Sequence, residues 1–383
     1  MPSLRIAIVH DWYTIYTGSE RVVEQMLVLF PEADLFSLVD FLPEPQRAFL
    51  KGKQVKTSFI QKLPFAHYQH RKYLILMPLA IEQLDLSAYD LVISSSHAIA
   101  KGVLTGPEQL HISYIHSPIR YAWDMQHEYL VDSGIEKGIR VWMARILLHY
   151  LRIWDSHTVN SIDALAANSR FIARRIWKIY RREARVIYPP VAVHRFKVRS
   201  DKENYYLAAS RLVPYKKMGL ILDAFVDMPD RKLVIIGDGP ELPRLRAKAP
   251  KNVQLLGYQP DEVLAEYLSN ARAFIFAAKE DFGILPVEAQ ACGTPVIAYG
   301  RGGVTESVED LTKPEPTGIF FDDQTVTALQ QAILEFEKNS TNISPDACRK
   351  NAERFSQERF RSEFREFVNE QILNATCLSL RNA

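Results

Sequence analysis

Two glutamates, Glu280 and Glu288, are the residues whose type and spacing most directly suggest chemistry. They lie eight positions apart in EDFGILPVEAQACGTPVIAYGRGG, residues 280–303. Carboxylates on the two sides of a helix start could accept hydrogen bonds from hydroxyls, one set from a ribose and one from a sugar, with a phosphate bound between them. In the alternative interpretation, Glu280 caps the helix and Glu288 faces solvent. The spacing alone leaves both interpretations open.

The elements around this pair are predicted from the flanking residues. The apolar run at 271–278 is typical of a buried strand, so Glu280 should follow the carboxyl end of that strand. Pro286 suits the first turn of a helix, and Gly293 can close the helix with a left-handed C-cap. The free N–H groups at the helix start predict an anion site formed by Gly283, Ile284 and Leu285.

A basic turn, SRLVPYKKMG at 210–219, follows another predicted strand. Arg211 and Lys216 bracket its proline, and a guanidinium fork with an ammonium is a suitable clamp for a diphosphate. Lys217 could replace Lys216, although the spacing favours Lys216. The alternative for the whole turn is a solvated basic loop.

The first half of the chain places single functional residues at the ends of predicted strands. Gly18, in TGSE, would let the backbone approach a phosphate or a sugar. His116, in HSPIRYAWD, could donate or accept a hydrogen bond beside a reacting centre. His97 and Lys101, in SSSHAIAKG, could do the same. A structural role is the alternative for each of them.

The order of predicted elements indicates an α/β protein with two facing Rossmann-like domains. Strand, polar turn and helix recur in both halves of the chain, and the Pro-Pro pair in VIYPPVAVHRF, at 186–196, predicts a linker. We expect an N-terminal domain over 1–190, a C-terminal domain over 191–360 and a ligand cleft between them. Phenylalanines at helical spacing predict a last helix, about 361–383, that crosses back to the first domain; they are Phe355, Phe360, Phe364 and Phe367.

Composition narrows the class of protein. With 383 residues, 47% hydrophobic and 24% charged, the chain is expected to form two globular domains. The net charge of +2 gives no global field that would favour nucleic acid. Three cysteines without metal-type spacing argue against a disulfide framework. The N-terminal apolar run is too short for a signal peptide, and no run is long enough to span a membrane.

Together these motifs resemble the retaining glycosyltransferases of family 4, which have the GT-B fold. The resemblance is carried by the Glu280–Glu288 pair, SRLVPYKK, GDGP and GTPVIAYGRGGVTE, and it covers nearly the whole chain. The segments HDW…TGSERV, MPLAIEQLDLSAYDLVISSSHAIAKGV and HSPIRYAWD are similar to a bacterial mannosyltransferase-like branch that assembles polysaccharides or lipid-linked glycans.

The resemblance implies a role for each matching residue in the second half. Glu280 would contact the hydroxyls of the donor sugar, and Glu288 would hold the nucleotide ribose. Arg211 and Lys216 would bind the diphosphate. The backbone that meets phosphate and sugar would be that of Phe282, Gly283, Ile284 and Leu285.

In the first half, the resemblance implies that Gly18 approaches the donor and that His116 lies near C6 of the sugar. The family usually has two glycines where this chain has Thr17-Gly18, which leaves the geometry of that loop open. Catalytic roles therefore fall to His116, Glu280, Arg211 and Lys216.

The implied reaction is transfer of a sugar from a nucleotide sugar, with retention of the anomeric configuration. Cations and a helix N-terminus would stabilise the leaving diphosphate. The sequence contains no Asp-x-Asp motif, so we expect no metal and no cofactor beyond the donor. GDP-mannose is the expected donor by branch resemblance, and UDP-sugars are the alternative.

Rival hypotheses are a sugar-nucleotide epimerase of the same fold, a non-catalytic binder, and an NAD-dependent dehydrogenase. Against the last, GDGPE lacks the third glycine of the dinucleotide fingerprint, because position 242 is Leu242.

The acceptor is expected to be a glycan or a lipid-linked molecule bound by the first domain. Basic residues are mixed with aromatic and aliphatic ones in QKLPFAHYQHRKYLILMP, 61–78, which favours peripheral contact with an anionic membrane. For KGIRVWMARILLHYLRIW, 137–154, a helix packed in the core with snorkelling arginines is the favoured interpretation. We therefore expect a cytoplasmic protein, associated with the inner face of the cytoplasmic membrane, that does not bind nucleic acid.

Overall fold

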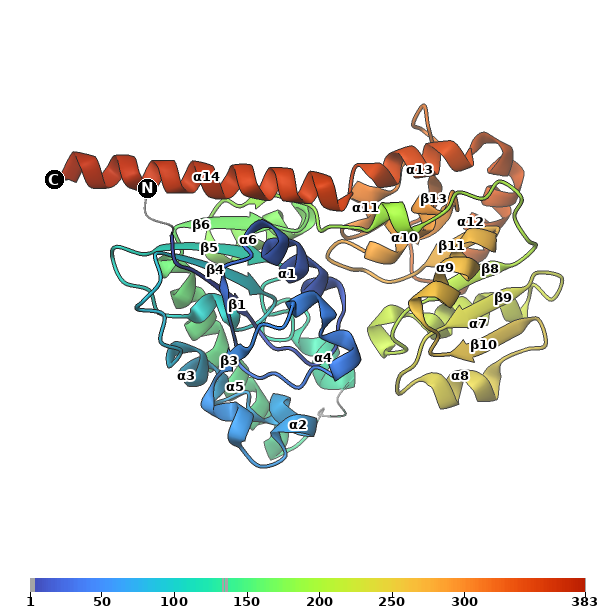
Figure 1. Ribbon diagram of the computed structural model, residues 1–383. Helices are drawn as coiled ribbons and strands as arrows, with labels where there is room; N and C mark the ends of the chain where they lie inside the picture. Colours follow the sequence, from blue (N-terminus) through green and yellow to red (C-terminus); the bar gives the residue numbers. More distant parts are fainter. Residues whose placement is uncertain (1–3, 133, 135–136, 383) are drawn as a thin grey trace. The chain divides into compact units, whose positions relative to one another are not determined.

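The computed structural model describes residues 4–132, 134 and 137–382 and divides into two compact units. The first unit contains the chain up to Tyr188 together with the residues from Phe360 onward, and the second unit is Pro189–Arg359. Residues 1–3 and 383, which belong to the predicted spans 1–190 and 361–383, lie outside the described residues. Each unit is built around one parallel sheet (Figure 1).

The sheet of the first unit has seven parallel strands in the order β3-β2-β1-β4-β5-β6-β7. Its central strands are buried on both faces, so they are continuous apolar or small-residue runs, not alternating ones. The order reverses between β1 and β4, which makes a topological switch point at their carboxyl ends. The strands are β1 Ile6–His10, β2 Asp34–Ser37, β3 Val55–Thr57, β4 Leu91–Ser96, β5 Leu110–Ile115, β6 Ala164–Ala167 and β7 Arg185–Val186.

Helices cover both faces of this sheet and enclose separate core clusters. Ser169 accepts a hydrogen bond from the backbone N–H of Ile172 and caps α6, as expected of a serine before a helical apolar pattern. The α-helices are α1 Gly18–Leu29, α2 Ala66–Gln69, α3 Met77–Glu82, α4 Gln126–Asp132, α5 Ile139–Thr158 and α6 Arg170–Tyr180. Short 3₁₀ helices are η1 Glu44–Gln46, η2 Ala48–Leu50, η3 Phe59–Lys62, η4 His70–Tyr73, η5 Ala100–Gly102 and η6 Val159–Ser161.

The second unit has a six-stranded parallel sheet in the order β10-β9-β8-β11-β12-β13. Its strands are β8 Tyr206–Ala209, β9 Leu233–Ile236, β10 Val253–Gly257, β11 Ala273–Phe276, β12 Val296–Tyr299 and β13 Gly318–Phe321. Its α-helices are α7 Met218–Val226, α8 Leu242–Lys248, α9 Asp261–Asn270, α10 Ile284–Ala291, α11 Val304–Ser307, α12 Val326–Asn339 and α13 Pro345–Glu353. Its 3₁₀ helices are η7 Val193–Arg195, η8 Pro214–Lys216 and η9 Ser340–Asn342.

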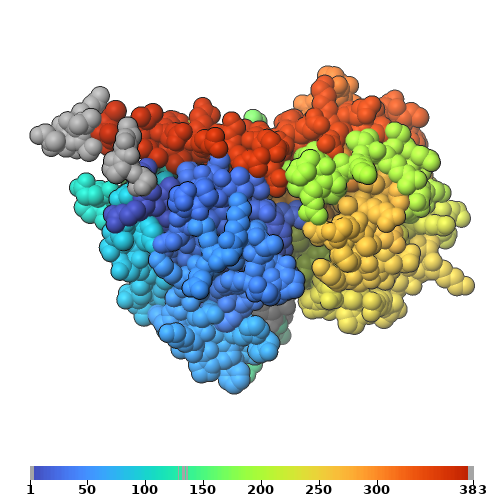
Figure 2. Space-filling view, viewed as in Figure 1, coloured from blue at the N-terminus to red at the C-terminus, as the bar shows by residue number. Residues whose placement is uncertain are grey.

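The last helix, α14 Gln357–Asn382, packs on the first unit (Figures 1 and 2). Phe360, Phe364 and Phe367 are buried in the same core cluster as residues of β1 and α1. Arg185 of β7 also forms ion pairs with two glutamates of this helix, Glu366 and Glu370. The predicted return of the C-terminal helix to the first domain is confirmed.

The prediction was wrong for Phe355. This residue lies in the break between α13 and α14, and its ring contacts Phe282 in the second unit. The helical spacing continued through a turn that the pattern alone did not reveal. With two Rossmann-like sheets and the returning helix, the predicted fold class is confirmed, while the cleft between the domains stays a prediction.

Candidate functional site

In the second unit, the candidate site residues lie in the loops at the carboxyl ends of β8, β9, β11 and β12, or directly after those loops. Carboxyl ends of neighbouring parallel strands meet at one edge of a sheet, where α/β proteins bind their ligands. Loops that are distant in sequence therefore gather here. The loops carry SRLVPYKK, GDGP, EDFG and GRGG respectively.

Lys216 and Glu280 are brought into direct contact at this edge. The Lys216 ammonium forms an ion pair with the Glu280 carboxylate, and each side chain keeps 17% of its surface exposed. Lys216 ends η8, whereas Lys217 adopts a left-handed conformation and is exposed. The structure thus joins the basic turn to the first glutamate through Lys216, the lysine that the spacing favoured over Lys217.

Two glycines hold the Glu280 loop from behind. Glu280 forms a parallel bridge with Gly302, and the N–H of Gly303 donates to the carbonyl of Glu280 at 2.8 Å. A Cβ on Gly303 would lie 2.1 Å from the carbonyl oxygen of Asp281, so no larger residue fits without a backbone shift. The GRGG stretch therefore fixes the position of Glu280.

The helix that carries the second glutamate begins as predicted. Gly283 is the N-cap of α10 with φ +89°, a conformation that favours glycine, and Gly293 follows the helix with φ +72°. The alternative interpretation, in which Glu280 caps the helix and Glu288 faces solvent, is wrong. Glu280 is not the cap, and Glu288 is 5% exposed and does not face solvent. A buried carboxylate is costly unless it is paired, which is consistent with a specific role for Glu288.

The loops after β8 and β9 brace each other and thereby fix the basic turn. The N–H of Leu212 donates to the carbonyl of Asp238 at 2.8 Å, and the N–H of Glu241 donates to the carbonyl of Leu212 at 3.1 Å. A Cβ on Gly237 would lie 1.8 Å from the carbonyl oxygen of Ser210. The glycines of GDGP therefore permit close packing of two backbones, which explains this motif without a dinucleotide.

Arg211 projects from this braced loop and is exposed. In the part of the chain that the structure describes, its side chain forms no hydrogen bond or ion pair, so the guanidinium is available to an anion. The first-turn N–H groups of α10 likewise have no intrahelical acceptor. The edge therefore presents a guanidinium, an ammonium and a helix N-terminus together with the carboxylate of Glu280.

In the first unit, Gly18 is the first residue of α1 and has no left-handed backbone angle. Thr17 is the N-cap, and Glu20 closes a capping box by accepting from the N–H of Thr17 at 2.9 Å. Glu20 is also held by the ring of His10, whose Nε2 lies 3.3 Å from its carboxylate. Burial would raise the pKa of Glu20, but His10 and Thr17 outweigh it and lower the pKa to about 2.

His116 follows β5 and lies against the end of β4. Its Nε2 is 2.8 Å from the hydroxyl oxygen of Ser95. Burial, reinforced by His97 and His10, lowers the pKa of His116 to about 3, so the ring is neutral at physiological pH. A neutral imidazole in this position can donate or accept a hydrogen bond.

Asp11 is a residue of this edge to which the sequence reasoning gave no role. Its fully buried carboxylate accepts hydrogen bonds from the N–H groups of His97, Ala98, Ile99 and Ala100, at 2.5 to 3.1 Å. It also contacts Nδ1 of His97 at 2.9 Å, and the His97 side chain stays 31% exposed. The position of Asp11 directly after β1, in HDW, was the available signal. Asp11 thus fixes the orientation of the His97 ring through Nδ1, while part of the ring remains exposed.

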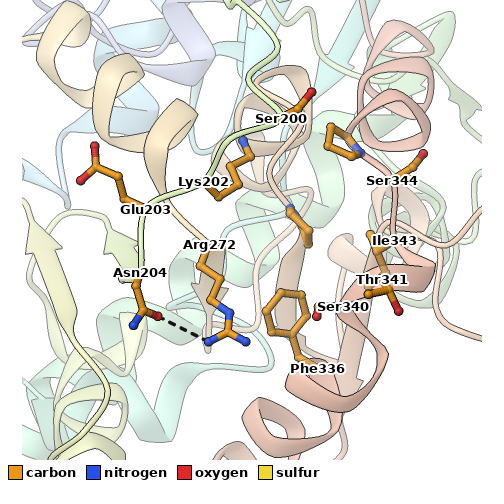
Figure 3. A pocket seen from close by; sticks show the side chains of 13 residues that line it. Ser200, Lys202, Glu203, Asn204, Arg272, Phe336, Ser340, Thr341, Ile343 and Ser344 are labelled. Carbon is orange, nitrogen blue, oxygen red and sulfur yellow. Dashed lines mark hydrogen bonds between the residues drawn. The ribbon is translucent and has the colours of Figure 1, made fainter.

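A cavity of about 530 Å³ lies in the second unit, at the amino ends of β8, β11 and β12 (Figure 3). Lys202, which lines it, donates to the carbonyls of Ser269 and Cys292 and to the hydroxyl of Thr294. Burial lowers the pKa of Lys202 to about 8. This cavity is at the sheet edge opposite to Glu280, and its central lysine is already satisfied by protein oxygens.

Neither a metal cluster nor a membrane span is found in the described residues. Within 4–132, 134 and 137–382, no group of three or more His, Cys, Asp or Glu side chains is arranged to hold a metal ion. No helix in the same ranges has both the length and the apolar character needed to cross a bilayer.

Part of the second unit is similar to a known family of proteins. Residues 192–355 match the family model described as glycosyl transferases group 1. An uncharacterized glycosyltransferase of Methanocaldococcus jannaschii is 28% identical over 193 residues, which are 49% of this chain and 53% of that protein. A GDP-mannose-dependent monoacylated alpha-(1-6)-phosphatidylinositol monomannoside mannosyltransferase of Corynebacterium glutamicum is 33% identical over 141 residues, 33% of this chain and 36% of that protein. The chain thus matches about half or less of the length of these relatives.

Solved structures extend the similarity to nearly the whole chain at the level of the fold. HepE of Anabaena, solved in complex with UDP, superposes with a TM-score of 0.67 at 16% identity. The superposition covers 96% of this chain and 100% of HepE. At this identity the similarity concerns the fold alone.

Proposed function

We propose that the chain transfers a sugar from a nucleotide sugar to a hydroxyl of an acceptor. Two observations support this proposal: residues 192–355 match the model of glycosyl transferases group 1, and the fold is that of GT-B proteins. The observation that carries this proposal is the ion pair between Lys216 and Glu280 beside the start of α10. It puts a cation, a carboxylate and a helix N-terminus within one small region, which matches the groups of a sugar diphosphate.

In the proposed mechanism, the second unit binds the donor. Arg211, Lys216 and the first turn of α10 hold the diphosphate and stabilise the charge that develops on it as the sugar leaves. Glu280 accepts hydrogen bonds from the sugar hydroxyls, and Glu288 accepts them from the ribose. The backbone of Phe282, Gly283, Ile284 and Leu285 completes the phosphate side of the site. These protein groups supply the stabilisation that a metal would otherwise provide, so the reaction needs no metal.

The first unit is proposed to supply Gly18, His116 and the acceptor site. A neutral His116, fixed by Ser95, suits a hydrogen bond to a sugar hydroxyl. The product retains the anomeric configuration, with the leaving phosphate accepting the proton of the attacking hydroxyl. An inverted product seen by NMR would overturn this part of the proposal.

GDP-mannose is the proposed donor, and the acceptor is a glycan or a lipid-linked molecule of polysaccharide or glycolipid synthesis. The name of the Corynebacterium glutamicum relative supports GDP-mannose, whereas the UDP bound to HepE supports the alternative of a UDP-sugar. We further propose a cytoplasmic enzyme that contacts the inner face of the membrane through residues 61–78.

The test is a thermal-shift panel without added metal, containing GDP, GDP-mannose, UDP-glucose, UDP-GlcNAc and NAD. A ligand at 100 times its dissociation constant stabilises the folded state by roughly 2.7 kcal/mol, which is a measurable shift. Shifts with GDP and GDP-mannose alone are expected. Shifts with UDP compounds would keep the class and change the donor, and a shift with NAD alone would contradict the proposal. Turnover of donor in the absence of any acceptor would favour an epimerase of the same fold.

A further inference from the structure

The outward face of α5 is apolar and exposed. Six large apolar side chains recur along it at i, i+3, i+4, i+7, i+11 and i+14, which places them within about 100° of the helix circumference. Trp142, Met143 and Ile146 belong to this stripe and are 64–66% exposed. The complete stripe is Ile139, Trp142, Met143, Ile146, Tyr150 and Ile153.

The opposite face of α5 explains why the sequence favoured a core helix for 137–154. Leu148, Leu151 and Trp154 are buried in the core cluster of the first unit. The helix is therefore apolar on two faces, and only one of them is covered. The expectation that this segment is packed in the core with snorkelling arginines is wrong for its outward face.

A second set of exposed apolar residues lies on the segment from η3 to α3. Phe65 and Tyr68 are 75% and 83% exposed, and Ile75 and Leu79 are 60% and 50% exposed. Soluble monomers seldom gather so many large apolar side chains on adjacent elements without a partner. These residues and the α5 stripe are together called the apolar surface below.

The two parts of the apolar surface belong to neighbouring elements. The indole N–H of Trp154, on α5, donates to Glu82, at the end of α3, over 2.6 Å. Leu148 and Leu151 share one core cluster with Met77 and Ile81 of α3. In Figure 1, α2, α3 and α5 gather at the same end of the first unit. The inner faces of α3 and α5 thus pack together while both outer faces remain open.

The two segments that carry the apolar surface contain charges of one sign only. No Asp or Glu occurs in 45–81 or in 137–154. Both segments instead contain exposed basic side chains: Lys62, Arg71, Lys72, Lys137, Arg140 and Arg145. Tryptophan and tyrosine with a basic fringe are the composition of helices that lie in the interface of an anionic bilayer.

We propose that this apolar surface seats the first unit on an anionic lipid bilayer, with α5 lying in the membrane interface. The inference extends the peripheral contact proposed for 61–78 and makes α5, not that segment alone, the principal membrane-binding element. Trp142, Met143 and Ile146 enter the boundary between headgroups and acyl chains, while Arg140 and Arg145 contact anionic headgroups.

A second copy of the chain fits this surface less well than a bilayer does. In a two-fold dimer the same patch meets itself, so its basic fringe would face an identical basic fringe. An anionic headgroup layer instead offers opposite charge across the whole surface.

The experiment is flotation of the full chain with vesicles of phosphatidylcholine alone or of phosphatidylcholine and phosphatidylglycerol in equal parts. We expect the wild type to float with the anionic vesicles and much less with the neutral ones, and added salt should weaken the binding. The double variant W142D/I146D should lower the partition coefficient by about tenfold or more, because two large apolar side chains no longer enter the lipid. R140Q/R145Q should lower it by about fivefold for each arginine and flatten the salt dependence.

The matched control is V226D/L334D in the second unit, where Val226 and Leu334 are also exposed. It should float like the wild type. The thermal shift with GDP should be the same in all variants. Failed flotation with an intact GDP shift would therefore overturn this inference, together with the membrane contact proposed for 61–78, and would leave the proposed sugar transfer standing. Normal flotation without a thermal shift by any nucleotide or nucleotide sugar would overturn the proposed sugar transfer and leave this inference standing. A wild type that does not float, a W142D/I146D variant that floats equally well, or a wild-type dimer that this variant converts to a monomer in light scattering would each overturn the membrane proposal.

Discussion

The two units hold a carboxylate at the carboxyl edge of their sheets in opposite ways. Asp11 in the first unit is fully buried and is saturated by four backbone N–H groups and the ring of His97. Glu280 in the second unit is partly exposed, is paired with Lys216, and is fixed by the backbone behind it. A saturated carboxylate can only orient its neighbours. A carboxylate with open surface beside a cation can exchange that partner for a ligand.

The same difference extends to the charges that each edge presents. The second unit exposes a guanidinium and an ammonium, Arg211 and Lys216, which suits a diphosphate. The first unit presents the neutral ring of His116 and the ring of His97, which suits hydroxyl groups. If the comparison is correct, removing Asp11 should damage the fold, whereas removing Lys216 should damage the chemistry.

The largest effect is expected from Asp11→Asn. The amide keeps one acceptor oxygen but turns an N–H₂ group toward backbone donors, so we expect the free energy of unfolding of the first unit to fall by about 3–5 kcal/mol. Urea denaturation followed by tryptophan fluorescence measures it, because all five tryptophans of the chain lie in the first unit. A loss below about 1 kcal/mol would mean that Asp11 is not the structural carboxylate of the comparison.

The pH dependence of this variant sharpens the assignment. Burial would raise the pKa of Asp11, but the ring and backbone N–H of His97, together with His10, lower the pKa well below its ordinary value of 3.8. A lowered folded-state pKa contributes stability that is present above the ordinary value and is lost as the pH falls through the folded-state pKa. The difference in stability between the wild type and Asp11→Asn should therefore shrink in acid, below about pH 4.

The next effect concerns the open carboxylate and its partner. Lys216→Ala should lower kcat for sugar transfer by about 10²–10³, or roughly 3–4 kcal/mol in the transition state, because a preorganised charge beside the leaving diphosphate is lost. Unfolding should change by less than about 1 kcal/mol, since the ion pair is partly exposed. Release of GDP from GDP-mannose, the proposed donor, measures the rate.

Lys217→Ala is the matched control, because the neighbouring lysine is exposed and does not pair with Glu280. It should leave the rate within a factor of about three. Equal losses in the two variants would show that general positive charge, and not the contact with Glu280, supports the reaction.

The recurrence of strand, turn and helix along the sequence was sufficient to predict both sheets and the return of the last helix. Apolar runs and turn glycines are local signals, so Gly283 and Gly293 could be placed at the two ends of α10 from their neighbours alone. The contact of Lys216 with Glu280 was predictable only as a common strand edge, since the two loops are far apart in sequence.

What could not be predicted depends on which face of an element is covered. Asp11 has no sequence neighbour that reveals its four backbone donors, because these come from the turn after β4. The helix α5 is apolar on two faces, and periodicity cannot tell which face meets protein. The break at Phe355 was hidden because the spacing of the phenylalanines continues through the turn.

The smallest expected effect comes from the backbone that holds Glu280. In Gly303→Ala the added Cβ would lie 2.1 Å from the carbonyl oxygen of Asp281, so the backbone must move and the free energy of unfolding of the second unit should fall by about 1–3 kcal/mol. The shift also displaces Glu280, so the thermal shift with GDP-mannose should decrease more than the shift with GDP, which lacks the sugar. Gly106→Ala, where the nearest atom is a side-chain oxygen at 3.6 Å, is the control and should change neither quantity appreciably. Equal loss of both thermal shifts would place the role of this loop on the nucleotide. If both thermal shifts were unchanged, Glu280 would be held by Lys216 and not by Gly302 and Gly303. The contrast with Asp11 would then rest on side chains alone.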